Sequence, residues 1–264
     1  MAQNVVDINE LIMKKTIDRV LFVWLFLTGL LGSLIGVPYT IAVLMDPAVG
    51  GPVDLPMVWL SAIGEAILFL APASAVGIWL GKQVGVGPKL LSIFVTQTSV
   101  NWKTLRSHFY AGLIVGLVLG VVGSIQNTLP KGALGAGLDN PSTFEYLLRC
   151  MSAAITEEIL FRLGLVTLFV WIIRKILKKP ALHVLALWIG SLVSSLLFAG
   201  AHLPHLLAFG SAGSSLVLII VGFSTATGLV MSWLYIRYGL VSAMIAHFIG
   251  DAFVYVLPRI LAMG

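Results

Sequence analysis

The sequence predicts an all-α integral membrane protein, a polytopic helical bundle with about seven transmembrane helices and bounds of six to eight. Three observations support this fold class. The 264 residues are 59% hydrophobic and only 10% charged, whereas soluble domains carry about 25% charged residues. The mean hydropathy is +1.03. Long runs almost without charge also alternate with short connections. This pattern is typical of a chain that crosses a bilayer several times.

Each predicted span contains the roughly 20 apolar residues that a membrane helix needs. The spans are 20–45, 55–81, 108–129 and 146–173, then two helices within 181–236, then 238–257. The run 181–236 contains no Asp, Glu, Lys or Arg and is long enough for two helices, joined near residues 203–215. The sequence Ser142–Glu145, STFE, fits a capping box at the start of the fourth helix.

Basic residues gather on alternate connections, which predicts the orientation of the chain. They precede the first span and follow the second, fourth and sixth: Lys14, Lys15, Arg19, Lys82, Lys89, Lys103, Arg106, Arg174, Lys175, Lys178, Lys179 and Arg237. By the positive-inside rule the N-terminus is cytoplasmic. The net charge of +5 is then a result of topology, and no nucleic-acid partner is expected. We expect a multi-pass protein of a prokaryotic plasma membrane.

The chain is predicted to form a single membrane domain, 1–264, with a motif-bearing catalytic core over 144–257. The first apolar run is too long for a signal-peptide core and is interpreted as an anchor. One cysteine, Cys150, excludes an internal disulfide framework. Gly112, Gly116 and Gly120 recur every four residues, a spacing that permits close helix approach. We expect this stripe to pack inside the bundle rather than in a dimer interface.

Charged residues inside the predicted spans are costly in hydrocarbon and indicate a functional site. The sequence TEEILFR holds two glutamates and an arginine. Glu158 and Arg162 are four residues apart and share a helical face, whereas Glu157 is rotated by about 100°. Glu158 is therefore predicted to pair with Arg162, which leaves Glu157 free to work. The alternative is that both glutamates pair with Arg162. Glu65 and Arg149 are both expected at the depth of the outer half of the bundle, where they could pair with each other.

Two further helices carry polar residues at helical spacing. FAGAH places Phe198 and His202 on one face, and HFIGD does the same for His247 and Asp251. A lone histidine on an apolar helix is usually a hydrogen-bonded core residue. A second helix with a His/Asp pair instead favours one shared site.

The ordered motifs Glu-Glu-x-x-x-Arg, Phe-x-x-x-His and His-x-x-x-Asp resemble those of the CPBP family, the type II CAAX prenyl endopeptidases and their bacterial relatives. They span residues 157–251. The resemblance implies an intramembrane endopeptidase that hydrolyses a peptide bond of a membrane-associated protein or peptide, lipidated or not. It implies that Glu157 is the general base, assisted by His202, and that His247 and Asp251 stabilise the oxyanion. Glu158, Arg162 and Phe198 would support the site.

The last motif position departs from the prenyl endopeptidases, where Asn is typical. An Asn side chain donates a hydrogen bond, whereas Asp251 donates only when it is protonated. An ionised Asp251 would repel an oxyanion. The Asp form occurs among bacterial relatives, so the departure weakens the prenyl-substrate interpretation more than the family assignment.

Other mechanisms and functions remain open. A metalloprotease would use Glu157, His202 and His247 as zinc ligands with one open position. The chain has no His-Glu-x-x-His motif, and a glutamate mechanism without a cofactor is favoured. A proton- or ion-coupled membrane carrier could use the same buried groups, although the sequence lacks repeated halves. A catalytically silent immunity or binding member of the family is the third interpretation.

Overall fold

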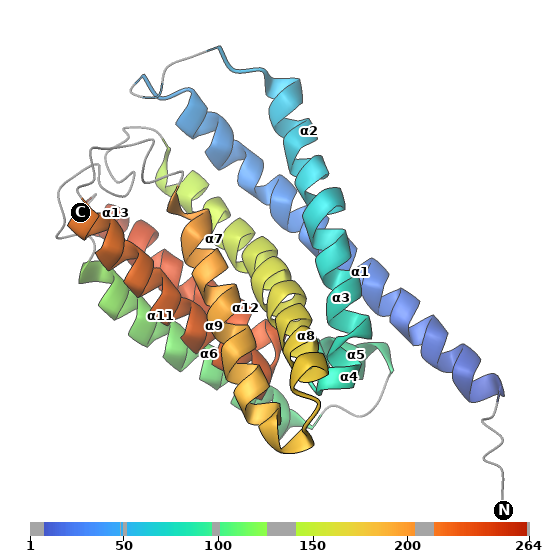
Figure 1. Cartoon of the computed structure of the whole chain (residues 1–264). Helices are drawn as coiled ribbons and strands as arrows, with labels where there is room; N and C mark the ends of the chain where they lie inside the picture. Colours follow the sequence, from blue (N-terminus) through green and yellow to red (C-terminus); the bar gives the residue numbers. More distant parts are fainter. Residues whose placement is uncertain are drawn as a thin grey trace, which may run out of the picture.

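The computed structural model describes residues 8–47, 49, 52–96, 101–125, 141–203 and 214–262. Within these ranges the regular structure is helical and contains no strand. The long helices lie beside one another as a bundle (Figure 1). Because six of the helices are long and apolar enough to cross a membrane, the structure confirms the predicted all-α polytopic bundle.

Three of the long helices change from α-helical to π-helical hydrogen bonding partway along. The long helices are α1 (Ile8–Leu44); α2 (Leu55–Glu65) with a π segment (Ala66–Leu70) and α3 (Ala71–Trp79); α6 (Trp102–Gly123); α7 (Thr143–Glu157) with a π segment (Glu158–Val166) and α8 (Thr167–Leu177); α9 (His183–Ala201); α11 (Ser214–Tyr238); and α12 (Leu240–Asp251) with a π segment (Ala252–Val256) and α13 (Leu257–Leu261). The short elements are α4 (Gly81–Val84), α5 (Lys89–Val95) and a 3₁₀ turn (Pro180–Leu182). Each π segment directly follows an acidic residue: Glu65, Glu157 or Asp251.

The helix formed by α7 and α8 is the one long unit absent from the six apolar spans. Its middle carries the TEEILFR charges, so its composition differs from that of an ordinary lipid-facing helix. Ser142 opens α7, and the capping box with Glu145 is present as predicted. Adding this helix to the six spans gives the seven expected from the sequence.

Several helix ends differ from the sequence-based spans. α1 begins at Ile8, because the basic segment before residue 20 is helical as well. Tyr238 ends α11 rather than opening the last span. Gly239 follows with a φ of 91°, a backbone conformation that favours glycine, and α12 begins at Leu240. The joint predicted within 203–215 lies mostly outside the described residues.

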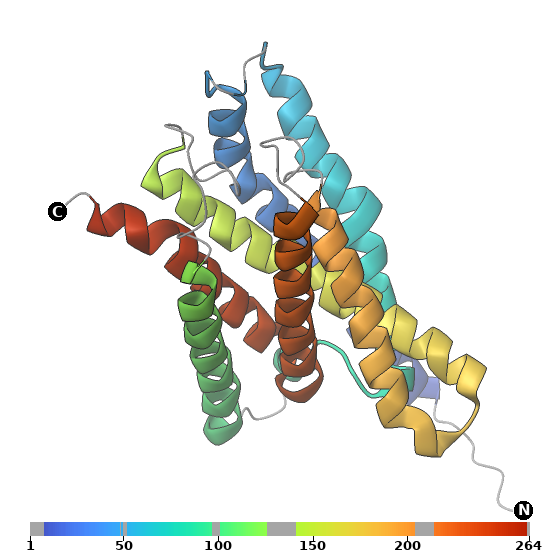
Figure 2. The ribbon, with the colours of Figure 1, turned by 60° about the vertical axis from the view of Figure 1, so that its left-hand side comes forward.

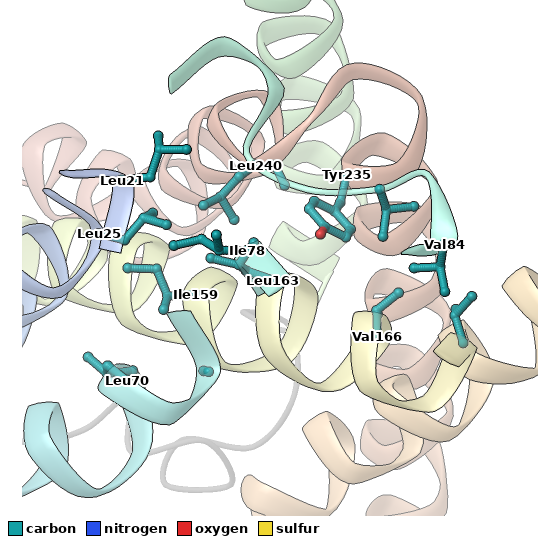
Figure 3. Close-up of a cluster of buried hydrophobic side chains, with 14 of the residues drawn as sticks. Leu21, Leu25, Leu70, Ile78, Val84, Ile159, Leu163, Val166, Tyr235 and Leu240 are labelled. Carbon is teal, nitrogen blue, oxygen red and sulfur yellow. The ribbon is translucent and has the colours of Figure 1, made fainter. Parts of the chain in front are cut away.

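The main apolar core packs around the π segment Glu158–Val166 (Figure 3). Ile159, Leu163 and Val166 of this segment are fully buried. They meet Leu21 and Leu25 of α1 and further buried side chains: Leu70, Ile78, Val84, Tyr235 and Leu240. The segment that carries the charged motif therefore also contributes to the main apolar core.

The glycine stripe of α6 packs against α12 and the π segment after it, as expected for a contact inside the bundle. Figure 2 shows α6 in green close to the red C-terminal helices. A Cβ atom built on Gly116 would lie 2.7 Å from the carbonyl oxygen of Ala246 and 2.8 Å from the Cβ of Ile249. Gly112 and Gly120 face similarly close neighbours. This close approach fixes the helix that carries His247 and Asp251.

We predict that Gly116→Val lowers the thermal unfolding temperature of the detergent-purified protein, because the added atoms force α6 and α12 apart. The expected loss is about 1–3 kcal/mol in unfolding free energy, typical of overpacking. The matched control is Gly222→Val on α11, where no atom of the described chain lies within 4 Å of an added Cβ. Equal unfolding temperatures for the two variants would contradict this packing.

Candidate active site

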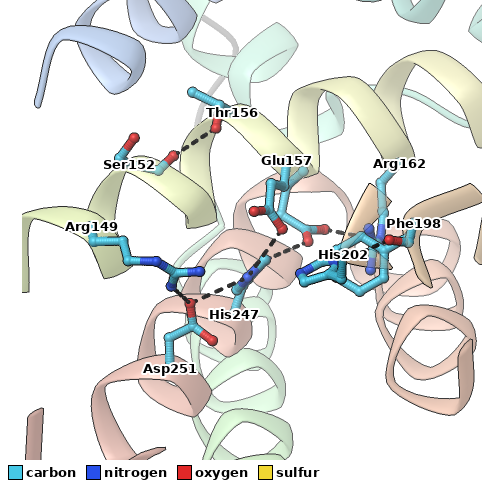
Figure 4. A network of polar contacts seen from close by, with 10 residues as sticks. Arg149, Ser152, Thr156, Glu157, Arg162, Phe198, His202, His247 and Asp251 are labelled. Carbon is cyan, nitrogen blue, oxygen red and sulfur yellow. Dashed lines mark hydrogen bonds and ion pairs between the residues drawn. The ribbon is translucent and has the colours of Figure 1, made fainter. Parts of the chain in front are cut away.

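A buried ion pair inside the π segment joins to a histidine from α12. The Nε atom of Arg162 lies 3.3 Å from Oε2 of Glu158, and the two side chains are 1% and 0% exposed. Glu158 Oε1 lies 2.8 Å from Nδ1 of His247, within hydrogen-bond distance. One glutamate thus faces both a guanidinium and an imidazole, and links the segment to α12. Figure 4 shows Arg162 and His247 within this network of polar contacts.

Arg162 is also covered by an aromatic ring from α9. Its Cζ atom lies 4.5 Å from the centroid of the Phe198 ring, a distance suited to a cation–π interaction. The Phe198 ring in turn lies edge-on to Phe161 and to the ring of His202. Phe198 therefore contacts both the charged pair and the histidine of its own motif.

Glu157 points to a different place from Glu158. Its Oε2 atom lies 3.7 Å from Nε2 of His247. Among the described residues this buried oxygen has no hydrogen-bond partner. The side chain is 25% exposed, whereas that of Glu158 is fully buried. Of the two glutamates, Glu157 is the one that can meet a water molecule or a substrate.

His202 reaches the level of Glu157 because of the hairpin between α8 and α9. Lys178 ends α8 in a left-handed conformation, with a φ of 52°. Glu157 lies 20 residues before Leu177, and His202 lies 19 residues after His183. Nearly equal lengths of helix bring the two side chains to a similar height. The Nδ1 atom of His202 lies 2.8 Å from the carbonyl oxygen of Phe198, and the residue lines the cavity described below.

Asp251 pairs with Arg149, for which the sequence suggested Glu65 as the partner. Its Oδ2 atom lies 3.5 Å from an Arg149 guanidinium nitrogen and 3.6 Å from Nε2 of His247. The expected Arg149–Glu65 pair is therefore wrong: Arg149 turns toward α12. The eight-residue spacing from Arg149 to Glu157 places both on one helical face. This spacing was the sequence signal that could have identified Arg149 as a site residue.

A cavity of about 140 Å³ brings the three motifs together. Glu157, Phe198, His202, His247 and Asp251 line it. Three tyrosines and Arg149 form its other end, and the Arg149 Cζ atom lies 5.6 Å from the ring centroid of Tyr39 and 5.0 Å from that of Tyr255. The ring of Tyr146 contacts both of the other rings. The apolar residues of the wall include Leu119, Ile220 and Phe223.

The donor set does not converge as a metal site. Across the described ranges, no three His, Cys, Asp or Glu side chains are placed to hold a metal ion. His247 Nδ1 is engaged by Glu158, and His202 Nδ1 by the Phe198 carbonyl. Residue 205, the other histidine near the motif, lies outside the described residues.

Comparison with known families places the motifs in context. Residues 139–253 match the family model described as type II CAAX prenyl endopeptidase Rce1-like. This match covers all three motifs and confirms the resemblance to the CPBP family. No curated protein and no solved structure matches the chain.

We predict that Glu158→Gln destabilises the protein by about 3–5 kcal/mol, because it leaves the buried Arg162 guanidinium without its charge partner. The measurement is the thermal unfolding of the detergent-purified protein. Glu157→Gln is the matched control: its side chain faces the cavity, and we expect a change below about 1 kcal/mol. If the two variants lost the same stability, the division of roles between the glutamates would be wrong.

Proposed function

We propose that the protein is an intramembrane endopeptidase whose general base is Glu157, on the premise that residues 139–253 match the family model of the type II CAAX prenyl endopeptidases. The observation that carries the proposal is the position of the Glu157 carboxylate. It is partly exposed to a cavity, has an oxygen with no hydrogen-bond partner within the described structure, and faces Nε2 of His247. A carboxylate placed in this way can accept a proton from water.

In the proposed mechanism, a water molecule lies between Glu157 and the carbonyl carbon of the scissile peptide bond. Glu157 takes one proton from the water as the oxygen attacks the carbonyl carbon. His202, which lines the cavity, holds the water in line through Nε2. When the tetrahedral intermediate collapses, the proton on Glu157 moves to the leaving nitrogen and the C–N bond breaks. A general base and acid of this kind contributes about 10²–10⁴-fold to the rate.

His247, Asp251 and Arg149 are proposed to stabilise the oxyanion as one group, in which Asp251 holds the two cationic side chains in place and does not itself donate a hydrogen bond. Glu158 accepts a hydrogen bond from Nδ1–H of His247 and so orients the ring. In the imidazolium form, whose charge the neighbouring carboxylates of Glu158 and Asp251 balance, Nε2 carries a second proton that can donate to the oxyanion. The guanidinium of Arg149, 3.5 Å from Asp251, offsets the negative charge that Asp251 brings to this position. An aspartate can thereby stand where prenyl endopeptidases typically carry Asn.

The proposed substrate is a membrane-associated peptide or protein, lipidated or not. Leu119, Ile220 and Phe223 offer the cavity an apolar wall suited to such a segment. We further propose that the catalytic core spans 144–257, that the mechanism needs no metal, and that the N-terminus is cytoplasmic in a prokaryotic plasma membrane. The basic connections support this orientation.

We predict that Glu157→Gln abolishes cleavage while leaving the protein folded, because the amide cannot accept the proton of the attacking water. Membranes from cells that express wild type and variant at equal levels are compared by mass spectrometry for peptide termini. Termini found only with wild type identify the substrate. They should persist when a zinc chelator is added, whereas their loss with chelator would assign the reaction to a metal enzyme.

The matched control is Glu65→Gln, which removes another carboxylate of a predicted span that does not line the cavity. Membranes from cells that express this variant should contain the same peptide termini as membranes from cells that express wild type. Identical termini from wild type and folded Glu157→Gln would refute the protease and favour the carrier or the silent binding protein. Uptake of solutes into proteoliposomes would then distinguish these two.

We predict that Arg149→Gln lowers the cleavage rate by about 100-fold, the scale of one lost oxyanion-stabilising group. The reason is that an ionised Asp251 then faces the developing oxyanion without its cation. The double variant Arg149→Gln/Asp251→Asn should recover most of the rate, because both charges are absent. The readout is the rate of appearance of the termini identified above.

Asp251→Asn alone serves as the reference for this rescue. If the double variant is as slow as Arg149→Gln, Arg149 acts through something other than the charge of Asp251, and the proposed role is wrong.

A further inference from the structure

A second cavity, separate from the candidate active site, lies where α8 ends beside α4. Its volume is about 230 Å³. Two segments of the chain line it, Gln83 and Val84 in one, and Trp171, Arg174, Lys175, Lys178, Lys179 and Pro180 in the other. Four of these side chains are cationic: Arg174, Lys175, Lys178 and Lys179. We call it the basic pocket. The position of α4 next to the end of α8 is visible in Figure 1.

Within the described residues, no carboxylate forms an ion pair with the cations of the basic pocket. Neither of the chain segments that build it contains an Asp or Glu: such residues are absent from 66–138 and from 159–250. Lys82, next to Gln83, pairs with Asp18 of α1. In the described part of the chain, none of the four pocket cations forms an ion pair with a carboxylate. The pocket therefore offers four positive charges to an external anion.

The pocket is held in shape by hydrogen bonds to Gln83. Trp171 Nε1 donates to the side-chain oxygen of Gln83 at 3.0 Å, and Arg174 donates to its backbone carbonyl at 2.6 Å. Lys175 Nζ lies 5.5 Å from the Trp171 ring centroid. Because Arg174 is used to join α8 to α4, the three lysines are the cations most free to meet a ligand.

Apolar side chains on the neighbouring helix surface indicate which anion fits. Ile176, at the end of α8, is 71% exposed. Val184, Leu185 and Trp188, near the start of α9, are also exposed. α9 packs against α8. The pocket thus lies at an end of the bundle where the outer faces of α8 and α9 are apolar, as the hydrocarbon chains of a lipid require. A soluble phosphate would contact only the cationic side chains of the basic pocket.

We propose that the basic pocket binds the phosphate headgroup of an anionic phospholipid at the membrane surface. The three lysines contact the phosphate, and Trp171 occupies the interfacial level where its amphipathic ring is favoured. The acyl chains extend from the pocket along the apolar outer surface of the bundle. Clusters of basic residues beside membrane helices attract anionic lipids in general. Here the cations also form a defined cavity, which predicts a retained lipid rather than a diffuse layer.

The test is native mass spectrometry of the delipidated full-length protein in detergent, titrated with phosphatidylglycerol or with phosphatidylcholine of the same acyl chains. Wild type should retain phosphatidylglycerol in preference. Lys175→Gln/Lys178→Gln/Lys179→Gln should weaken that binding by about tenfold or more. A matched control, Lys14→Gln/Lys15→Gln/Lys103→Gln, removes the same charge away from the pocket and should bind as wild type does.

Two further arms keep the proposal falsifiable. The corresponding triple Lys→Arg variant should restore binding, which excludes misfolding as the cause of the loss. Glycerol 3-phosphate in excess should not displace the lipid, because it lacks the acyl chains. Displacement by glycerol 3-phosphate would assign the pocket to a soluble phosphate, and equal loss in the pocket and control variants would reduce it to general surface charge. Either result overturns the proposal.

Discussion

The site depends on the neutralisation of one guanidinium buried in the middle of the bundle. Arg162 is almost fully buried and contacts side chains from two helices. Glu158 on its own helix supplies the compensating negative charge, and the Phe198 ring on α9 covers the face of the guanidinium. Glu158 has a second contact, to His247 on α12. A single buried ion pair therefore sets the relative positions of the three helices that carry the motifs. A buried charge would be strongly destabilising without these partners.

This arrangement explains why the motif needs two adjacent glutamates. Glu158 is fully buried, with one oxygen in an ion pair with Arg162 and the other within hydrogen-bond distance of His247. It has no freedom to take part in chemistry. Glu157 lies about 100° around the helix and faces the cavity, where it meets the opposite ring nitrogen of the same histidine. Two neighbouring carboxylates thus occupy two different environments, and only one of them is accessible.

The sequence predicted the parts of the structure that follow from local rules. Runs without charge located the spans, and four-residue spacing brought together Glu158 with Arg162 and placed Phe198 beside His202. The π segments could not be predicted, since the same apolar pattern fits an α-helix. The Arg149–Asp251 contact joins residues 102 positions apart, and no periodicity within one helix reports such a pairing. Assigning Arg149 to Glu65 rested on an estimate of depth alone, which does not determine the direction of a side chain.

The three π segments have a consequence for how related chains should be aligned. A π-helical ring contains one residue more than an α-helical ring. A chain could lose one residue there and still form an unbroken helix, now with ordinary α pairing. Everything beyond the deletion would turn by about 100° relative to what precedes it. A single-residue gap after Glu157 or Asp251 would therefore leave the fold intact while moving Arg162 or the final turns of the chain to another face. Such a gap separates homologues that share the bundle from those that share the site.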